Sequence, residues 1–145
     1  RPPRSTLCPY TTLFRSHFNG TLMGNLGMQV IEVSKERAVV ELPVHGGLMT
    51  PSGHIHTGSM VSLADTSATF AAMAALGQAI TLEEMPVAVS ISTQIISNVK
   101  DGTLRSESVV AHPGRTLVAV TTRITADGGK LLALVNSTHF VRSSD

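Results

Sequence analysis

The chain has 145 residues, of which 42% are hydrophobic and 14% charged, and its formal net charge at pH 7 is +1. This length is typical of one domain, and a charge so near zero gives no basis for a nucleic-acid or membrane-surface partner. No apolar run approaches the roughly 18 residues that a transmembrane helix needs, so we predict a single domain with no nucleic-acid and no membrane partner.

The two ends of the chain differ in character from everything between them. Residues 1–16 fit no element that follows, and residues 11–16 and 142–145 can both be encoded by one common sequencing-adapter oligonucleotide. We therefore expect residues 1–16 and 142–145 to be non-native and residues 17–141 to form the single native domain. The only cysteine, Cys8, lies in the first of these segments. A native domain without cysteine has no disulfide and no thiol nucleophile, which fits our expectation of a cytoplasmic protein.

The first part of the domain predicts a hairpin followed by a loop. Residues 18–26 are compatible with a short helix or loop that covers a sheet. Residues 28–33 and 38–44 have the pattern of two strands, joined by a turn at residues 34–37. The glycines and the proline within residues 45–53 predict a loop there.

The longest helix-compatible stretch follows this loop. Residues 59–76 contain no Gly or Pro and are rich in Ala, Met and Leu, which are good helix formers. Apolar side chains surround most of the circumference, which predicts a buried helix. Gly77 is typical of the end of a helix. Residues 78–86 form a connection that contains an acidic pair, Glu83 and Glu84, which we interpret as the solvated charge of a loop.

The second half predicts four strands, at residues 87–96, 103–112, 116–126 and 130–141. Turn signals rich in Asp, Gly and Pro separate them, and connections this short predict that consecutive strands are antiparallel neighbours. Two strands, one buried helix and four strands together predict an α+β fold. One helix cannot cover both faces of such a sheet, and the later strands carry apolar residues on both alternating sets, which favours self-association.

The polar side chains of the predicted helix are the candidates for chemistry. Ser62, Asp65, Thr66 and Thr69 recur at spacings of three and four, so they share one stripe that could face a cleft. Asp65 is the only ionisable residue in the helical stretch, and Asp is unfavourable inside a helix. It is either a hydrogen-bonded structural carboxylate or a catalytic group.

The start of the helix supplies a second candidate. Thr57 lies where loop becomes helix, and the free N–H groups and helix dipole at such a junction favour an anion or an oxyanion. An N–H donor and a carboxylate on one helix are two of the parts that acyl hydrolysis needs. His54 and His56 precede the junction and also fit a structural role, in which their rings cap the helix or bond to the backbone.

The residues around this junction resemble a known signature. His56-Thr57-Gly58, followed by Ser62-Leu63-Ala64-Asp65-Thr66, is similar to the His-Gly-Gly and Leu-Ala-Asp-Thr signature of hotdog-fold acyl-CoA thioesterases, in particular the phenylacetate-degradation type. The similarity extends from about residue 24 to residue 140. It implies a hotdog fold, in which an antiparallel sheet of five to six strands wraps around one long buried helix. It also implies an acyl-CoA substrate bound between subunits of a homodimer or homotetramer, with no cofactor and no metal.

The resemblance also assigns roles to individual residues. Asp65 would be the general base or the nucleophile, and the backbone N–H of Thr57 would polarise the thioester carbonyl, within a motif that His56 and Gly58 complete. Ser90 matches a position that, in some relatives, a neighbouring subunit supplies to orient the attacking water.

Two residues depart from the family pattern, and five more are candidates for substrate contact. Thr57 stands where Gly is usual, and Thr50 stands where many relatives have an Asn that holds the water or nucleophile. Thr66 and Thr69 share the stripe of Asp65. Three basic residues at or beside turns are candidates for the phosphates of coenzyme A, namely Lys100, His112 and Arg115.

Other functions are compatible with parts of this pattern. A hotdog hydratase or dehydratase would pair a His with the carboxylate, and His56 is the only candidate near the helix. A non-catalytic acyl-CoA-binding hotdog protein would share the fold and pocket, although the presence of Asp65 favours an enzyme. A Ser-His-Asp hydrolase is disfavoured because no G-x-S-x-G motif occurs. A cupin-type metal site at His54 and His56 is disfavoured because no Glu follows closely.

Overall fold

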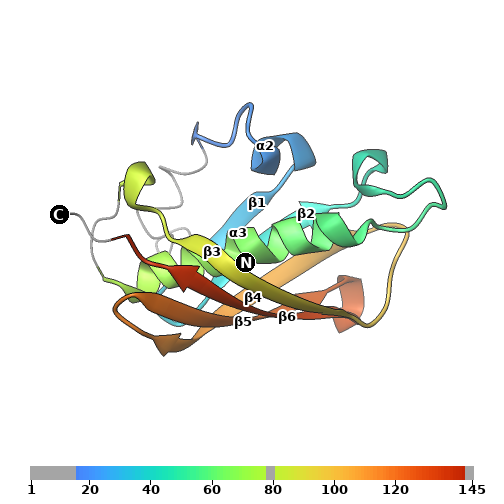
Figure 1. Ribbon diagram of the computed structural model, residues 1–145. Helices are drawn as coiled ribbons and strands as arrows, with labels where there is room; N and C mark the ends of the chain where they lie inside the picture. The colour runs from blue at the N-terminus through green and yellow to red at the C-terminus, as the bar shows by residue number, and fades with distance from the viewer. Residues whose placement is uncertain (1–15, 78–80, 143–145) are drawn as a thin grey trace.

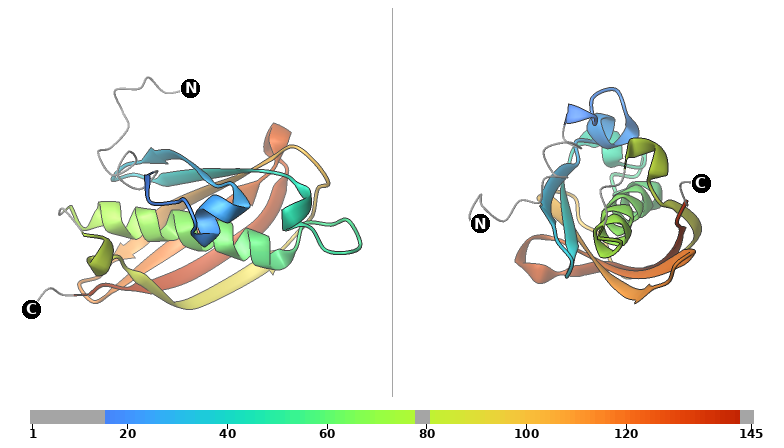
Figure 2. Two further views of the ribbon diagram at one scale, coloured as in Figure 1. Left: turned by 90° about the horizontal axis from the view of Figure 1, so that it is seen from above. Right: turned by 90° about the vertical axis from the view of Figure 1, so that its left-hand side faces the viewer.

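The computed structural model describes residues 16–77 and 81–142, and in this part of the chain a six-stranded antiparallel sheet wraps around one long helix (Figure 1). Viewed along the helix, the sheet curves around it (Figure 2). This confirms the predicted α+β hotdog architecture. The helix is α3 (Thr57–Ala75), and the strands are β1 (Gln29–Val33), β2 (Ala38–Pro43), β3 (Val87–Ile95), β4 (Thr103–Pro113), β5 (Leu117–Thr125) and β6 (Leu131–Phe140).

Some expectations concern residues outside this description. The segments predicted to be non-native lie outside it except for Ser16 and Arg142, and Cys8 lies outside it too. The same holds for residues 78–80, at the start of the connection after the helix. The remainder of that connection contains a short 3-10 helix, η3 (Leu82–Glu84), which carries the exposed Glu83.

Helix α3 is buried along most of its length, as its composition predicts. Its caps are local: His56 lies at the N-cap, and Gly77, with φ 63°, adopts the left-handed conformation just beyond the C-cap residue Leu76. Large side chains such as Met60, Leu63 and Phe70 are at most 1% exposed. Since burial of each such side chain contributes about 1.5–3 kcal/mol, packing against the sheet is what stabilises this helix. None of the helices in the described ranges has the length and apolarity that crossing a membrane requires.

The sheet presents one face to α3 and the other to solvent. On β5, Val118, Val120 and Ile124 are buried against the helix, whereas Leu117 is 46% exposed. Exposed apolar side chains form a row across this outer part of the sheet, which includes Leu117, Phe140 and Val87. Phe140 of β6 pairs with Leu117 of β5 on one side and with Val87 of β3 on the other. The apolar residues noted on both alternating sets of the later strands therefore occupy two faces, one of them uncovered in the single chain.

The predicted strand neighbours are correct for β4, β5 and β6 and wrong for β3. The sheet order is β1-β2-β4-β5-β6-β3, so β3 pairs with β6, and β4 lies between β2 and β5. The reason is the connection at residues 96–102, which is longer than a hairpin loop and crosses the end of the sheet. The Asp101–Gly102 signal only directs the chain into β4.

The segment before the first strand contains a short helix, α2 (Leu22–Leu26), and it covers α3 rather than the sheet (Figure 2). Phe18, which precedes α2, stacks on Phe70 of α3 with ring centroids 6.2 Å apart. Phe18 is 7% exposed. Phe18 and Phe70 therefore hold the leading segment against the middle of the buried helix.

Candidate functional site

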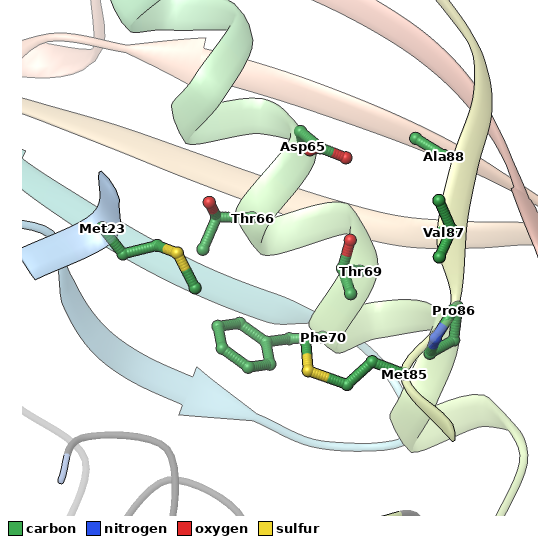
Figure 3. Close-up of a pocket in the computed structure, with 9 residues that line it drawn as sticks. All are labelled: Met23, Asp65, Thr66, Thr69, Phe70, Met85, Pro86, Val87 and Ala88. Atoms are coloured by element: carbon green, nitrogen blue, oxygen red, sulfur yellow. The ribbon is translucent and has the colours of Figure 1, made fainter. Parts of the chain in front are cut away.

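Asp65 lies in a mostly apolar hollow beside the middle of α3. The hollow has a volume of about 290 Å³. Figure 3 shows Asp65, Thr66, Thr69 and Phe70 on one side of it, with the chain that leads into β3 opposite. Three segments far apart in sequence thus form one cavity around a single carboxylate. Its lining residues are Met23, Asp65, Thr66, Thr69, Phe70, Met85, Pro86, Val87 and Ala88.

The carboxylate of Asp65 is buried without a hydrogen-bond partner at one oxygen. Its Oδ1 atom is buried, and no hydrogen bond reaches it from any residue that the structure describes. Desolvation by burial raises the pKa of Asp65 above the ordinary value of 3.8. A carboxylate oxygen that is sheltered from water and free to accept a proton has the properties of a general base.

The two threonines that follow Asp65 on the stripe both line the same hollow. The hydroxyl of Thr66 donates to the carbonyl of Ser62 at 2.8 Å, which leaves its lone pairs directed elsewhere. Thr69 is 9% exposed and lines the hollow one helical turn beyond Asp65. Both predicted substrate-contacting threonines therefore share a cavity with Asp65.

The beginning of α3 has one backbone donor that lacks a partner. The N–H of Gly58 donates to Nδ1 of His56 at 2.8 Å, and the N–H of Ser59 donates to the carbonyl of His56 at 2.9 Å. Nδ1 of His56 is thus the acceptor that caps the first turn of the helix. Within the described residues, no hydrogen bond occupies the N–H of Thr57, and Thr57 is exposed. The sequence predicted this free donor from the helix start alone.

Thr57 and Asp65 do not share a cavity within one chain. They are eight residues apart on one helix, which corresponds to about 12 Å along its axis. The residues around Thr57 line a separate hollow of about 320 Å³, which His56 and Gly58 border and Asp65 does not. One chain therefore holds the N–H donor and the carboxylate at two places too far apart to act on one carbonyl group.

The side chain of Thr50 belongs to a local turn. Its hydroxyl shares a hydrogen bond of 2.8 Å with the hydroxyl of Ser52 and donates to the carbonyl of His54 at 3.2 Å. Its N–H also donates to the carbonyl of His54, at 2.7 Å. In the single chain Thr50 thus closes the loop before α3 and reaches neither Asp65 nor the N–H of Thr57.

The other predicted residues are spread over the surface. Ser90 is exposed on β3, opposite Thr138 of β6. Lys100 precedes the start of β4, whereas His112 and Arg115 lie at the other end of that strand. An eleven-residue strand spans roughly 36 Å, so one chain does not bring Lys100 together with His112 and Arg115.

Sequence reasoning missed several residues that line the cavity of Asp65. In the sequence, Phe70, Met73 and Met85 are visible only as generic apolar positions. The structure places Phe70 and Met85 in the lining, and Met73 in the core. Met23 and Ala88 were not singled out, because only the tertiary arrangement brings α2 and the start of β3 to this part of α3. No group of three metal-ligating side chains occurs within residues 16–77 and 81–142.

Comparison with known proteins agrees with the fold and the motif. The model of the thioesterase superfamily matches residues 52–133, more than half of the chain. A 1,4-dihydroxy-2-naphthoyl-CoA hydrolase of Listeria monocytogenes is 26% identical over 121 residues, which cover 83% of this chain and 95% of that protein.

Two solved structures illustrate how closely the fold is shared. A thioesterase from Haemophilus influenzae has a TM-score of 0.82 at 19% identity, covering 92% of this chain and 90% of its own. The PaaI protein from the phenylacetic acid degradation operon of E. coli has a TM-score of 0.79 at 20% identity, with coverages of 93% and 94%. At these identities the likeness concerns the fold.

Proposed function

The chain belongs to the thioesterase superfamily and is a thioester hydrolase of the hotdog fold, and we propose that it cleaves an acyl-coenzyme A thioester into the free acid and coenzyme A. The observation that carries this proposal is the unpartnered, buried Oδ1 atom of Asp65 in an apolar hollow. A hollow of this kind receives the acyl group, and the carboxylate faces the carbon that is attacked. The name of the Listeria relative, a CoA hydrolase, supports coenzyme A as the leaving group.

Asp65 would supply the base of this reaction. The oxygen of a water molecule bonds to the carbonyl carbon while Asp65 takes its proton, and the C–S bond then breaks as the proton passes to the sulfur of coenzyme A. General base catalysis of this kind contributes about 10²- to 10⁴-fold in rate. Direct attack by the same carboxylate, through an anhydride that water hydrolyses, would use the same atom and give the same products.

The free N–H of Thr57 would stabilise the oxyanion. During the reaction the carbonyl oxygen becomes negatively charged, and a backbone donor at a helix start is oriented for it before the reaction begins. The threonine side chain, where relatives have Gly, leaves this donor intact because the bond is made by the backbone.

Since one chain keeps Thr57 and Asp65 about 12 Å apart along the helix, we propose that a homodimer completes the site. Strand β3 is an edge of the sheet, and several of its apolar residues are exposed, among them Val89 (59%), Ile91 (38%) and Ile95 (41%). A long apolar edge strand is a template for pairing with another chain. The other edge, β1, is five residues long and contains a bulge.

Antiparallel pairing of two β3 strands would bring the two halves together. The start of β3, at Val87 and Ala88, lines the hollow of Asp65, and the segment after β3 is bonded to Ile55, just before Thr57. A two-fold axis at the middle of β3 therefore places the Asp65 end of one copy beside the Thr57 end of the other. Ser90, on the same strand, would then lie at the interface, as the family resemblance implies.

The proposed hydrolysis is tested by release of free coenzyme A, measured with a thiol reagent over a panel of acetyl, medium-chain, long-chain and aryl-acyl thioesters. Asp65→Asn should lower kcat by about 10²- to 10⁴-fold. Asp127→Asn, the same change at a carboxylate outside both hollows, is the matched control and should retain activity. A wild-type protein inert across the panel, or an active Asp65→Asn variant, would contradict the proposal.

The shared site is tested by complementation between two inactive variants. Thr57→Pro removes the backbone N–H of residue 57, which is the first helical position, and Pro is well tolerated there. The preceding residue, His56, already has the extended conformation that a following Pro requires (φ −63°, ψ 134°). This variant should lose about 10²- to 10³-fold in kcat. Mixed and reassociated with Asp65→Asn, it should regain about a quarter of wild-type activity, because half of the dimers then carry one intact site. If the mixture stays inactive although mixed dimers have formed, the site does not combine residues of two chains.

A further inference from the structure

The loop that leads into α3 has an edge that its own hydrogen bonds leave open. Met49 and Ile55 form an isolated antiparallel bridge. On either side of it, the N–H of Thr50 donates to His54 at 2.7 Å, and the N–H of His56 donates to Leu48 at 2.9 Å. In this pattern the N–H and carbonyl of Ile55 point away from the loop. Because Ile55 is 2% exposed, these two groups need partners other than water.

One side chain satisfies both groups. Oδ1 of Asn98 accepts the N–H of Ile55 at 3.0 Å, and Nδ2 of Asn98 donates to the carbonyl of Ile55, also at 3.0 Å. The amide of Asn98 thus pairs with Ile55 as a neighbouring strand would. The backbone of Asn98 is held as well, because Nζ of Lys130 donates to the main-chain carbonyl of Asn98 at 2.9 Å.

We infer that Asn98 is a positioning residue that fixes the N–H of Thr57 for the reaction, and this inference rests on the proposed function of Thr57. Only His56 separates Ile55 from Thr57, so a shift of Ile55 moves the first turn of α3. Asn98 follows β3, the strand proposed to form the dimer interface, by three residues. The clamp between Asn98 and Ile55 would therefore fix the oxyanion donor relative to the partner's carboxylate, and not only within its own loop.

The expected consequence is a loss in kcat with little change in KM. Asn98 lines neither of the two hollows beside α3, so substrate binding should be largely retained when it is replaced. Misplacement of a catalytic group by about 1 Å can cost about 10²-fold in rate. We expect Asn98→Ala to lower kcat by about 10-fold, as a partial misplacement of this kind.

A matched control lies one residue earlier. The hydroxyl of Ser97 donates to the carbonyl of Leu131 at 2.5 Å, so it also ties this segment to a backbone group, but to the start of β6 instead of the loop before α3. Ser97→Ala should keep kcat close to that of the wild type. Asn98→Asp is a second variant, in which the new side chain has the same shape as Asn. One carboxylate oxygen can still accept the N–H of Ile55, but the other replaces the Nδ2 donor and lies against the carbonyl of Ile55. This variant should lose kcat as Asn98→Ala does.

A double-mutant cycle separates positioning from general damage. In the Thr57→Pro background the donor is absent, so Asn98→Ala should lower kcat no further. Amide hydrogen exchange supplies a readout without substrate: the amide of Ile55 should exchange faster in Asn98→Ala and remain protected in Ser97→Ala. Equal losses in the Ser97 and Asn98 variants, or an undiminished effect of Asn98→Ala in the Thr57→Pro background, would overturn the inference. If the wild type releases no coenzyme A, the proposed function fails, and unchanged exchange at Ile55 would separately refute the clamp.

Discussion

Ser67 and Asp65 lie two residues apart on α3, and each places a polar group among apolar side chains, yet their surroundings differ. Ser67 donates to the carbonyl of Ala64 at 3.2 Å and contacts the hydroxyls of Ser106 at 2.6 Å and Ser108 at 2.7 Å. Ser108 in turn contacts the hydroxyl of Thr122 at 2.6 Å. Asp65, on the other side of the helix, has a buried oxygen with no partner in the described part of the chain.

This difference separates a structural polar group from a functional one. Polar side chains buried in a protein are almost always hydrogen-bonded, because an unsatisfied group costs about 1–3 kcal/mol. The hydroxyl cluster of Ser67 meets this rule and joins the helix to β4 and β5. Asp65 violates it at the border of an open hollow, where a substrate or a water molecule can become the missing partner.

The largest expected effect on stability is at the satisfied site. Ser67→Ala leaves the hydroxyl of Ser106 buried and without its partner, so the free energy of unfolding should fall by about 1–3 kcal/mol, as measured by urea denaturation. The activity of the folded variant should remain within a few-fold of wild type. Ser62→Ala is the control for stability: its hydroxyl also donates to a carbonyl of the preceding turn, at 2.8 Å, but without a buried network, and it should cost much less. Equal losses in the two variants would remove the distinction.

The comparison also shows what the sequence could and could not predict. The helix and the six strands follow from apolar runs and alternation, and they were predicted; the turn residues were read correctly between β4, β5 and β6 but not between β3 and β4. Asp65 and Thr57 stood out because one is a charge in an apolar helix and the other lies at its start. Ser67 did not stand out, although it is also a buried polar residue, because a serine in a helix gives no indication of the hydroxyls that it contacts.

The parts that sequence reasoning missed depend on contacts between distant segments. The position of β3 at the edge of the sheet follows from a connection whose length, and not its Asp-Gly pair, is decisive. Met23 and Ala88 reach the hollow of Asp65 only after α2 and β3 have packed on α3. Asn98 meets Ile55 forty-three positions earlier in the chain, and a single asparagine in a loop gives no indication of such a contact.

His139 offers an intermediate case that tests the same rule. Its side chain is fully buried; Nε2 hydrogen-bonds the hydroxyl of Ser137 at 3.0 Å, whereas Nδ1 has no partner among the described residues. Burial lowers the pKa of His139 below the ordinary 6.5. The neutral ring is therefore favoured in the folded state, and its contribution to stability is present above pH 6.5 and is lost as the pH falls through the lowered folded-state pKa.

Replacing His139 should remove this pH dependence. The slope due to one such group is at most about 1.4 kcal/mol per pH unit. Urea denaturation of the wild type and of His139→Gln between pH 7.5 and pH 5 should show a smaller decline in the variant, even if the variant is less stable throughout. Parallel curves for the two proteins would mean that the buried ring does not titrate with unfolding. Activity should not depend on this residue, since it lines neither hollow.

The smallest expected effect has the opposite sign and concerns Asp65. Because burial raises its pKa above 3.8, the folded state favours the protonated form, so the contribution of Asp65 to stability is present below pH 3.8 and is lost as the pH rises through the folded-state pKa. At neutral pH the charged side chain opposes folding, by on the order of 1 kcal/mol or less because solvent partly screens it. Asp65→Asn should thus be inactive and slightly more stable than the wild type at pH 7, with the difference shrinking toward pH 4. Urea denaturation of both proteins across this range measures it. A loss of stability at pH 7 would instead show that the carboxylate is held by favourable interactions, and Asp65 would then resemble Ser67 as a structural group.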